Sequence, residues 1–185
     1  MRFERAAIPD VILVVPQVFA DERGFFFESY RKDLFHAYGI MDEFVQESHS
    51  RSSRGTLRGL HYQVKPRSQA KLIRVLAGEI FDVAVDIRKV SPTFGRSVLT
   101  TLSPRDHAML YIPVGFAHGF LAMEEATEVL YMTSEVYSPE HERGIRWDDP
   151  DLGIPWPRLD RDYIISEKDK GNPRFRAADT SLVIP

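Results

Sequence analysis

Residues 56–63 place an arginine and a histidine inside a stretch that is otherwise typical of a β-strand. The stretch is rich in aliphatic, β-branched and aromatic residues, and the pair Lys65-Pro66 that follows favours a turn. Histidine titrates near neutral pH, so His61 suits a general base. A single histidine in a strand is more often a structural residue held by hydrogen bonds, and a catalytic role for His61 therefore needs partners elsewhere in the chain.

Three other side chains have the chemistry that such partners require. Lys71 could stabilise an oxyanion as negative charge develops on it. Strand alternation places Tyr131 on a half-buried face of residues 128–133, where its phenol could donate a proton. Asp169 could orient His61 and stabilise its charged form. The long separation of Asp169 from His61 along the chain leaves their contact open.

The histidines do not follow the spacing of a metal site. None of the 6 histidines forms an HxH, HxxxH or HExxH pattern. Residues 113–118 are similar to the second half of the metal motif of the cupins, a double-sheet jelly-roll family. The first half of that motif should lie near His61, where its remaining histidine and glutamate ligands are missing. We therefore expect no metal ion.

Among the arginines that adjoin a glycine are Arg23, before Gly24, and Arg58, before Gly59. A guanidinium suits bidentate recognition of phosphate, so this pair could bind a pyrophosphate. An ordinary surface position is the alternative for both.

Composition excludes several classes of protein. The formal net charge is −3 with both signs interleaved, and the absence of a basic stripe argues against a nucleic-acid partner. The chain has no cysteine, which excludes disulfides, thiolate metal sites and cysteine nucleophiles. No secretory signal and no membrane-spanning run is visible. We expect a cytoplasmic protein with no membrane partner.

Short apolar segments separated by turn residues predict the fold. At 185 residues, of which 43% are hydrophobic, residues 1–185 can form a single domain with a sizeable core. Turn signals recur every eight to twelve residues, which is typical of a closed or double-sheet all-β fold. A short connecting helix is predicted at residues 32–38, with Gly39 at its end. The predicted strands are residues 11–15, 25–30, 44–50, 56–63, 71–77, 79–87, 98–102, 109–112, 116–122 and 128–133.

The character of the sequence changes beyond Tyr137, at the end of a core that covers about residues 11–137. Residues 138–185 are rich in turn residues and hold too few apolar side chains for a second core, so we expect them to wrap the β-structure. In the predicted strand 25–30, Phe25, Phe26 and Phe27 place aromatic side chains on both faces of the strand. One of these faces should therefore contact another chain, a ligand or a second sheet. The alternative is an ordinary core strand that is buried on both faces.

Taken together and in order, these motifs resemble the dTDP-4-dehydrorhamnose 3,5-epimerase family over nearly the whole chain. The segments that carry the resemblance are residues 23–28, 57–63, 69–71, 81–88, 91–95, 112–120, 131, 147–150 and 166–169.

The resemblance implies an all-β, double-sheet jelly roll of the cupin type, with short peripheral helices. It also implies a homodimer with an exchanged N-terminal strand, no cofactor and a dTDP-sugar substrate. By resemblance, His61 is the base, Asp169 its partner, Tyr131 the acid on the opposite face of the sugar, and Lys71 the group that stabilises the enolate. The implied substrate-binding residues are Arg23, Phe26, Glu28, Gln46, Ser48, Arg58, His118, Tyr137, Glu142 and Lys168.

One position departs from the family pattern. The family usually has Gln-x-Asn, and this chain has Gln46-Glu47-Ser48, so Ser48 stands in place of the asparagine. The shorter serine puts one substrate contact, and the range of epimerisation, in question. The implied activity is an isomerase reaction that inverts C3 and C5 of dTDP-4-dehydro-6-deoxy-D-glucose in dTDP-L-rhamnose biosynthesis. The alternatives are an epimerase of C3 only or C5 only, a 3,4-ketoisomerase on the same fold, and a non-catalytic sugar-binding jelly roll.

The implied site raises a geometric problem in the strand that carries His61. Strict alternation points Arg58 away from His61, whereas the resemblance needs both in one site. Gly59 lies between them and could permit a bulge. We therefore predict an irregular ladder at Gly59.

Overall fold

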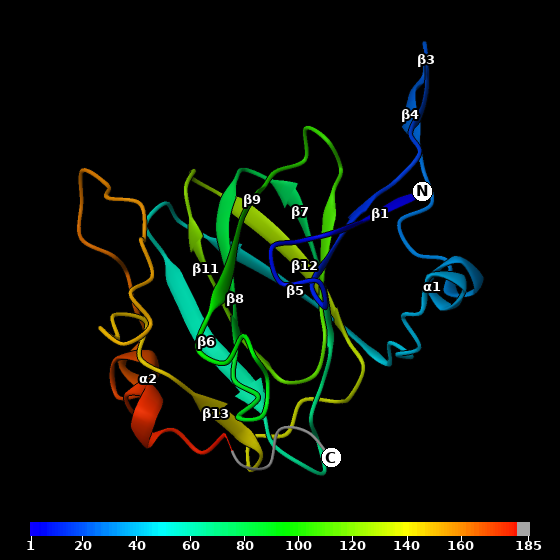
Figure 1. Cartoon of the computed structure of the whole chain (residues 1–185). Helices are drawn as coiled ribbons and strands as arrows, with labels where there is room; N and C mark the ends of the chain where they lie inside the picture. Colours follow the sequence, from blue (N-terminus) through cyan, green and yellow to red (C-terminus); the bar gives the residue numbers. More distant parts are fainter. Residues whose placement is uncertain (181–185) are drawn as a thin grey trace.

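A computed structural model describes residues 1–180, which form two antiparallel sheets packed face to face (Figure 1). The first sheet has six strands, in the order β1 (Arg2–Arg5), β2 (Ile12–Val15), β10 (Met109–Ile112), β7 (Lys71–Ala77), β12 (Thr127–Thr133) and β5 (Gln46–Ser52). The second has five, in the order β13 (Glu142–Gly144), β6 (Leu57–Gln63), β11 (Phe116–Ala122), β8 (Ile80–Asp86) and β9 (Ser97–Leu102). The predicted all-β, double-sheet jelly roll is confirmed.

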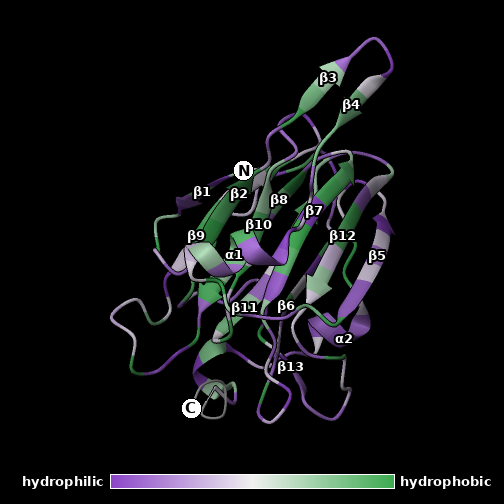
Figure 2. Ribbon diagram, turned by 90° about the vertical axis from the view of Figure 1, so that its right-hand side faces the viewer, coloured by the Kyte–Doolittle hydropathy of each residue, from purple (hydrophilic) through white to green (hydrophobic). Residues whose placement is uncertain are grey.

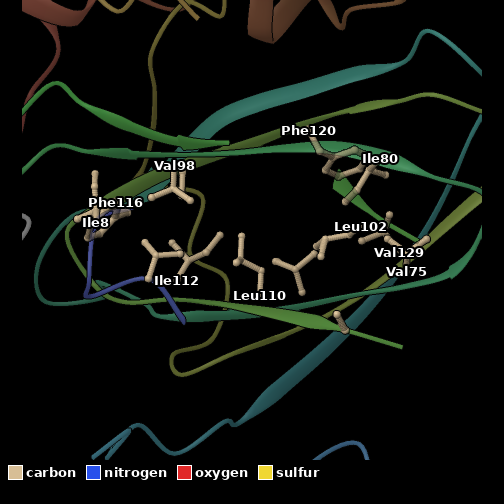
Figure 3. Packing of buried hydrophobic residues seen from close by; sticks show 14 residues of the cluster. Ile8, Val75, Ile80, Val98, Leu102, Leu110, Ile112, Phe116, Phe120 and Val129 are labelled. Atoms are coloured by element: carbon tan, nitrogen blue, oxygen red, sulfur yellow. The ribbon is translucent and has the colours of Figure 1, made fainter. Parts of the chain in front are cut away.

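Strand alternation explains how the sheets pack. In β8, Ile80 and Ala84 point between the sheets, whereas Val83 and Val85 point to the outer side. Figure 3 shows the inner side chains of both sheets, among them Leu110 of the first, converging in the space between them. This apolar cluster fills one part of the sandwich and fixes the separation of the two sheets.

The C-terminal segment covers the outer face of the second sheet. Trp156 and Ile145 are buried there, and they join Val83 and Val85 of β8 in one apolar cluster. The predicted wrapping of residues 138–185 is confirmed for its described part, and residues 181–185 lie outside the described residues. Two short helical elements were not predicted in this segment, α2 (Glu167–Lys170) and a 3₁₀ turn (Phe175–Ala177).

Helix α1 (Lys32–Tyr38) lies at the outer face of the first sheet. Phe35 is fully buried in the cluster that joins the helix to β2, β7 and β10. Gly39 ends the helix with φ of 96°, a left-handed conformation that glycine adopts without a Cβ clash. The predicted helix 32–38 is confirmed.

A two-stranded hairpin, β3 (Phe19–Asp21) and β4 (Gly24–Phe26), projects away from both sheets (Figures 1 and 2). The prediction of a strand over residues 25–30 is wrong beyond Phe26. The chain turns back at Phe27, whose ring lies 4.6 Å from the guanidinium carbon of Arg74 and 4.8 Å from the ring of His107. Phe25, inside β4, also packs on His107, with ring centroids 4.6 Å apart, so contact with His107 continues across the end of the strand.

The edge strands β1 and β13 were not predicted from the sequence. Both are short, and charged residues occupy most of β1 and two of the three positions of β13. Neither therefore shows the apolar alternation by which a strand is recognised.

Candidate active site

A cavity of about 660 Å³ lies between the two sheets, a volume that suits a small-molecule ligand. Its wall is formed by β5, β7 and β12 on one side, by β6 and β11 on the other, and by the segment that contains α2. Side chains on the first sheet stand in cross-strand rows. Thr133 pairs with Gln46 and Lys71, and Tyr131 pairs with Ser48 and Ile73.

His61 and Asp169 form a hydrogen-bonded pair in this wall. His61 Nε2 lies 2.6 Å from Asp169 Oδ1, and the Asp169 side chain is only 5% exposed. Ser166 caps α2 by accepting a hydrogen bond from the backbone N–H of Asp169 at 3.1 Å. Burial alone would raise the pKa of Asp169, but the hydrogen bond and charge of His61 outweigh it, and the pKa lies below its ordinary value.

The ladder between β6 and β11 is irregular at Gly59. His118 pairs with His61 but Phe120 pairs with Arg58, so β6 carries one extra residue. Gly59 has φ of 127°, and a Cβ on it would lie 2.5 Å from Gly119 Cα. The irregularity directs the Gly59 N–H to Asp169 Oδ2, 3.3 Å away. The predicted bulge is confirmed, and Arg58 and His61 both line the cavity.

Lys71 extends from β7 into the same cavity and donates a hydrogen bond to the backbone oxygen of His61 at 3.3 Å. Burial lowers the pKa of Lys71 to about 8, although the negative charges of Glu142 and Asp82 act in the opposite direction. Its ammonium group is therefore poorly solvated, which strengthens its interaction with any anion that forms in the cavity.

Tyr131 approaches the cavity from the other sheet. It lies on β12 with Val129 and Thr133, and all three line the cavity, as strand alternation predicted. Since His61 stands on β6 of the second sheet, the imidazole and the phenol come from opposite walls. A flat ligand between the sheets would have a base on one face and a phenol on the other.

Polar side chains on neighbouring segments form a connected network in the wall. Glu142 Oε2 accepts a hydrogen bond from the Tyr137 hydroxyl at 2.7 Å and is paired with Lys168. Gln46 Oε1 accepts from the backbone N–H of Tyr137 at 2.8 Å, and its Nε2 donates to Ser48 Oγ at 3.1 Å. All five residues line the cavity.

His118 and Arg58 also line the cavity, each with its own partner. His118 Nε2 lies 2.8 Å from Asp82 Oδ2, and both residues are buried. Arg58 Nε donates to Ser52 Oγ at 3.2 Å. Asp82 was not singled out from the sequence, although its charge on the inner face of an apolar strand was a usable signal.

Arg23, Phe26 and Glu28 lie away from this cavity, in or just after the projecting hairpin. Arg23 pairs with Asp21 on the hairpin, and Phe26 is 66% exposed. Within one chain, these three predicted substrate-binding residues are not brought to the other predicted ones.

Two structural features are absent from the part of the chain that the structure describes. Within residues 1–180, no group of three or more His, Cys, Asp or Glu side chains is placed to hold a metal ion. In the same part of the chain, no helix has both the length and the apolar character needed to cross a membrane.

The family model described as dTDP-4-dehydrorhamnose 3,5-epimerase matches residues 5–177. The chain belongs to this epimerase family. The family member of Pseudomonas aeruginosa is 53% identical over 180 residues, which cover 97% of this chain and 98% of that protein. The family member of Shigella flexneri is 48% identical over 180 residues, with the same coverage of both chains.

A solved structure shares the family fold. The dTDP-6-deoxy-D-glucose-3,5-epimerase of Legionella pneumophila, in complex with dTDP-4-keto-L-rhamnose, superposes with a TM-score of 0.93 at 42% identity. The match covers 98% of this chain and 96% of that one. The present epimerase is thus an isomerase of the same type, as the sequence motifs predicted.

Proposed function

We propose that this epimerase binds dTDP-4-dehydro-6-deoxy-D-glucose in the cavity between the sheets and inverts C3 and C5 to give dTDP-4-dehydro-L-rhamnose, for dTDP-L-rhamnose biosynthesis. The observation that carries the proposal is the His61–Asp169 pair facing Tyr131 across a cavity that also holds Lys71. The complex of the Legionella pneumophila relative with dTDP-4-keto-L-rhamnose supports the choice of ligand.

The reaction begins with removal of a proton next to the C4 ketone. An Nε2–H that donates to Asp169 leaves Nδ1 of His61 as the nitrogen that accepts this proton. The carboxylate then stabilises the imidazolium that forms. A positioned base of this kind contributes about 10²–10⁴-fold to the rate.

The electron pair of the broken C–H bond moves to the C4 oxygen and gives an enolate. Lys71, already cationic and poorly solvated at neutral pH, is the group that stabilises this oxyanion. Tyr131 then delivers a proton to the same carbon from the opposite face, and the ketone re-forms with inverted configuration. The imidazolium then releases its proton to solvent and the phenolate takes one up. C3 and C5 both adjoin the C4 ketone, so the same groups, once reset, serve both inversions in turn.

The other predicted residues that line the cavity bind the rest of the substrate. Arg58 supplies a guanidinium for the pyrophosphate. Gln46, Ser48, Tyr137, Glu142 and Lys168 form a polar wall that can exchange its internal hydrogen bonds for bonds to the ligand. His118, held by Asp82, offers its other ring nitrogen to the sugar. The proposed reaction uses these side chains alone and requires no cofactor.

One measurement separates this function from its alternatives. The purified protein is incubated with dTDP-4-dehydro-6-deoxy-D-glucose in D₂O, and the deuterium is located by NMR. Deuterium at both C3 and C5 is expected. Label at one carbon alone would support a C3-only or C5-only epimerase. A binding module without catalysis would give no label, and that outcome would reject epimerisation.

We further propose that two chains form a homodimer in which the projecting hairpin of each reaches the cavity of the other. The hairpin exposes Phe19, Phe25 and Phe26 by 56%, 60% and 66%, an apolar surface that a second chain would cover. Arg23, Phe26 and Glu28 would then complete the partner's site. The C-terminal segment shares an apolar cluster with the second sheet, which supports the proposal that each chain is a single domain. A cytoplasmic location stays a prediction.

Mixing two inactive variants tests the exchanged hairpin. Arg23→Ala and His61→Ala damage different parts of the site, so a mixed dimer has one site in which both residues are intact. Random re-association should restore about a quarter of the wild-type activity. No recovery in a mixture shown by mass spectrometry to contain mixed dimers would contradict the exchange.

A further inference from the structure

We infer that Gly144 is a positioning residue: its lack of a side chain lets the segment that carries Asp169 close against His61. The inference rests on the proposed role of the His61–Asp169 pair.

Gly144 is the cross-strand partner of His61. Strand β13 pairs with β6 in antiparallel register, with Gly144 opposite His61 and Glu142 opposite Gln63. Directly opposed residues of an antiparallel pair point to the same face. Glu142, Gln63 and His61 all line the cavity, so a side chain at position 144 would point to the cavity side, next to His61.

The amide of Asn172 already occupies that place. A Cβ on Gly144 would lie 2.3 Å from Asn172 Nδ2 and 2.4 Å from both Cγ and Oδ1. Real Cβ contacts essentially never fall below 3.0 Å, so even a methyl group must displace the side-chain amide of Asn172. Asn172 Nδ2 is buried without a hydrogen-bond partner among the described residues. Packing against Gly144, rather than a hydrogen bond from this nitrogen, therefore sets the position of the amide.

Backbone hydrogen bonds connect the region of Asn172 to α2 on one side and to the residues just after β13 on the other. Its N–H donates to the backbone oxygen of Asp169 at 3.3 Å, and the next residue, Pro173, accepts a hydrogen bond from Arg146 N–H at 2.9 Å. A displacement that moves the Asn172 backbone would be passed to Asp169 through the two intervening residues and one hydrogen bond. An error of about 1 Å in the placement of a catalytic group can cost about 10²-fold in rate.

The first test is the substitution Gly144→Ala, combined with Asn172→Ala. Gly144→Ala alone should lower kcat by about 10–100-fold with KM nearly unchanged, because Asp169 is displaced while the nucleotide contacts remain. Asn172→Ala removes all three atoms nearest to the added methyl group. The double variant should therefore recover kcat to within a few-fold of the Asn172→Ala single variant.

Gly171→Ala is the matched control. Gly171 adjoins Asn172, has φ of −81°, and a Cβ on it would meet its nearest atoms at an ordinary 3.5 Å. This variant should keep wild-type kcat and the same thermal midpoint within a few degrees.

A crystal structure of Gly144→Ala gives a readout that does not depend on turnover. A His61 Nε2–Asp169 Oδ1 distance well above 2.6 Å is expected. Wild-type kcat in Gly144→Ala, an unchanged distance, or a loss of kcat that Asn172→Ala does not reverse would overturn the inference. If Gly144→Ala fails to fold, recovery of fold and turnover in the double variant is the deciding result, and its absence overturns the inference. Failure of the proposed function is seen separately, as normal turnover in His61→Ala.

Discussion

Nε2 of His61 lies 2.6 Å from Oδ1 of Asp169, although 108 positions separate the two residues along the chain. The contact exists because the C-terminal segment wraps the second sheet and places α2 beside β6. The bulge at Gly59 adds a second hydrogen bond, from the Gly59 N–H to the other carboxylate oxygen at 3.3 Å. Both oxygens of Asp169 are therefore held by the strand that carries His61.

Asp169→Asn tests the charge of this pair. Asparagine keeps the shape of the side chain but cannot stabilise an imidazolium, so kcat should fall by about 10²–10⁴-fold while KM changes little. Steady-state kinetics measures both quantities. Glu167→Gln, two residues earlier on α2 with a 90% exposed side chain, is the control and should retain wild-type kcat. A loss of less than tenfold in Asp169→Asn would show that the carboxylate is dispensable.

The pH profile tests Lys71. Because burial lowers its pKa to about 8, kcat should fall as the pH rises through about 8 and the ammonium loses its proton. Lys71→Arg, which stays charged, should remove this basic limb from whatever activity it retains. The profile is measured between pH 6 and 10, with Lys32→Arg, a substitution in the exposed ion pair with Glu43, as control. A basic limb that survives in Lys71→Arg would exclude Lys71 as its source.

The same shift predicts a stability effect of defined sign. Between about pH 8 and the ordinary lysine pKa near 10.5, the unfolded state binds more protons at Lys71 than the folded state does. The free energy of unfolding of the wild type should therefore rise with pH in this window relative to Lys71→Met. Urea denaturation at several pH values measures the difference, and a constant or falling difference would contradict the assignment.

Tyr131→Phe separates proton removal from inversion. His61 can still remove the proton and return a solvent-derived one to the same face, so deuterium exchange in D₂O should persist. Inversion should fall by about 10²–10⁴-fold, because the opposite face has lost its acid. NMR reports label and configuration together. Tyr163→Phe, which loses a hydroxyl bonded to Pro157 O outside the cavity, is the control. Normal inversion in Tyr131→Phe would remove the phenol from the mechanism.

Gly59→Ala tests the bulge. The added Cβ would lie 2.5 Å from Gly119 Cα at a φ of 127°, so both a backbone clash and a disfavoured conformation oppose it. The free energy of unfolding should drop by about 2–5 kcal/mol. Urea denaturation measures the drop, with Gly171→Ala as the unstrained control. A loss below 1 kcal/mol would mean that the strand can relax at small cost, on the scale of an ordinary surface substitution.

The sequence predicted the sheet strands where a local pattern defines them. Apolar alternation identifies β8, short apolar-rich runs between turn signals identify β7 and β11, and the glycine at position 39 marks the end of α1. The strand predicted over residues 25–30 is shorter because its partner β3 begins at Phe19, which pairs with Phe26, and Phe27 contacts Arg74 and His107 instead, both distant in sequence. Strands β1 and β13 were missed because their charged residues carry no alternation.

The residue types of the site could be predicted from the sequence, but the contacts that hold these residues in place could not. Alternation placed Tyr131 correctly, and the glycine between Arg58 and His61 pointed to the bulge. No local pattern could show that Asp169 reaches His61, since this depends on the path of the whole C-terminal segment. The buried pairing of Asp82 with His118 is likewise a contact between neighbouring strands that requires the register of the sheet.

His61→Ala tests the central assignment most directly. The wild type and the variant are each incubated with dTDP-4-dehydro-6-deoxy-D-glucose in D₂O, and dTDP binding is measured separately by calorimetry. Removing the imidazole should abolish both deuterium incorporation and inversion, while dTDP binds with an affinity close to that of the wild type. Near-normal epimerisation or deuterium incorporation by His61→Ala would contradict the assignment of His61 as the base.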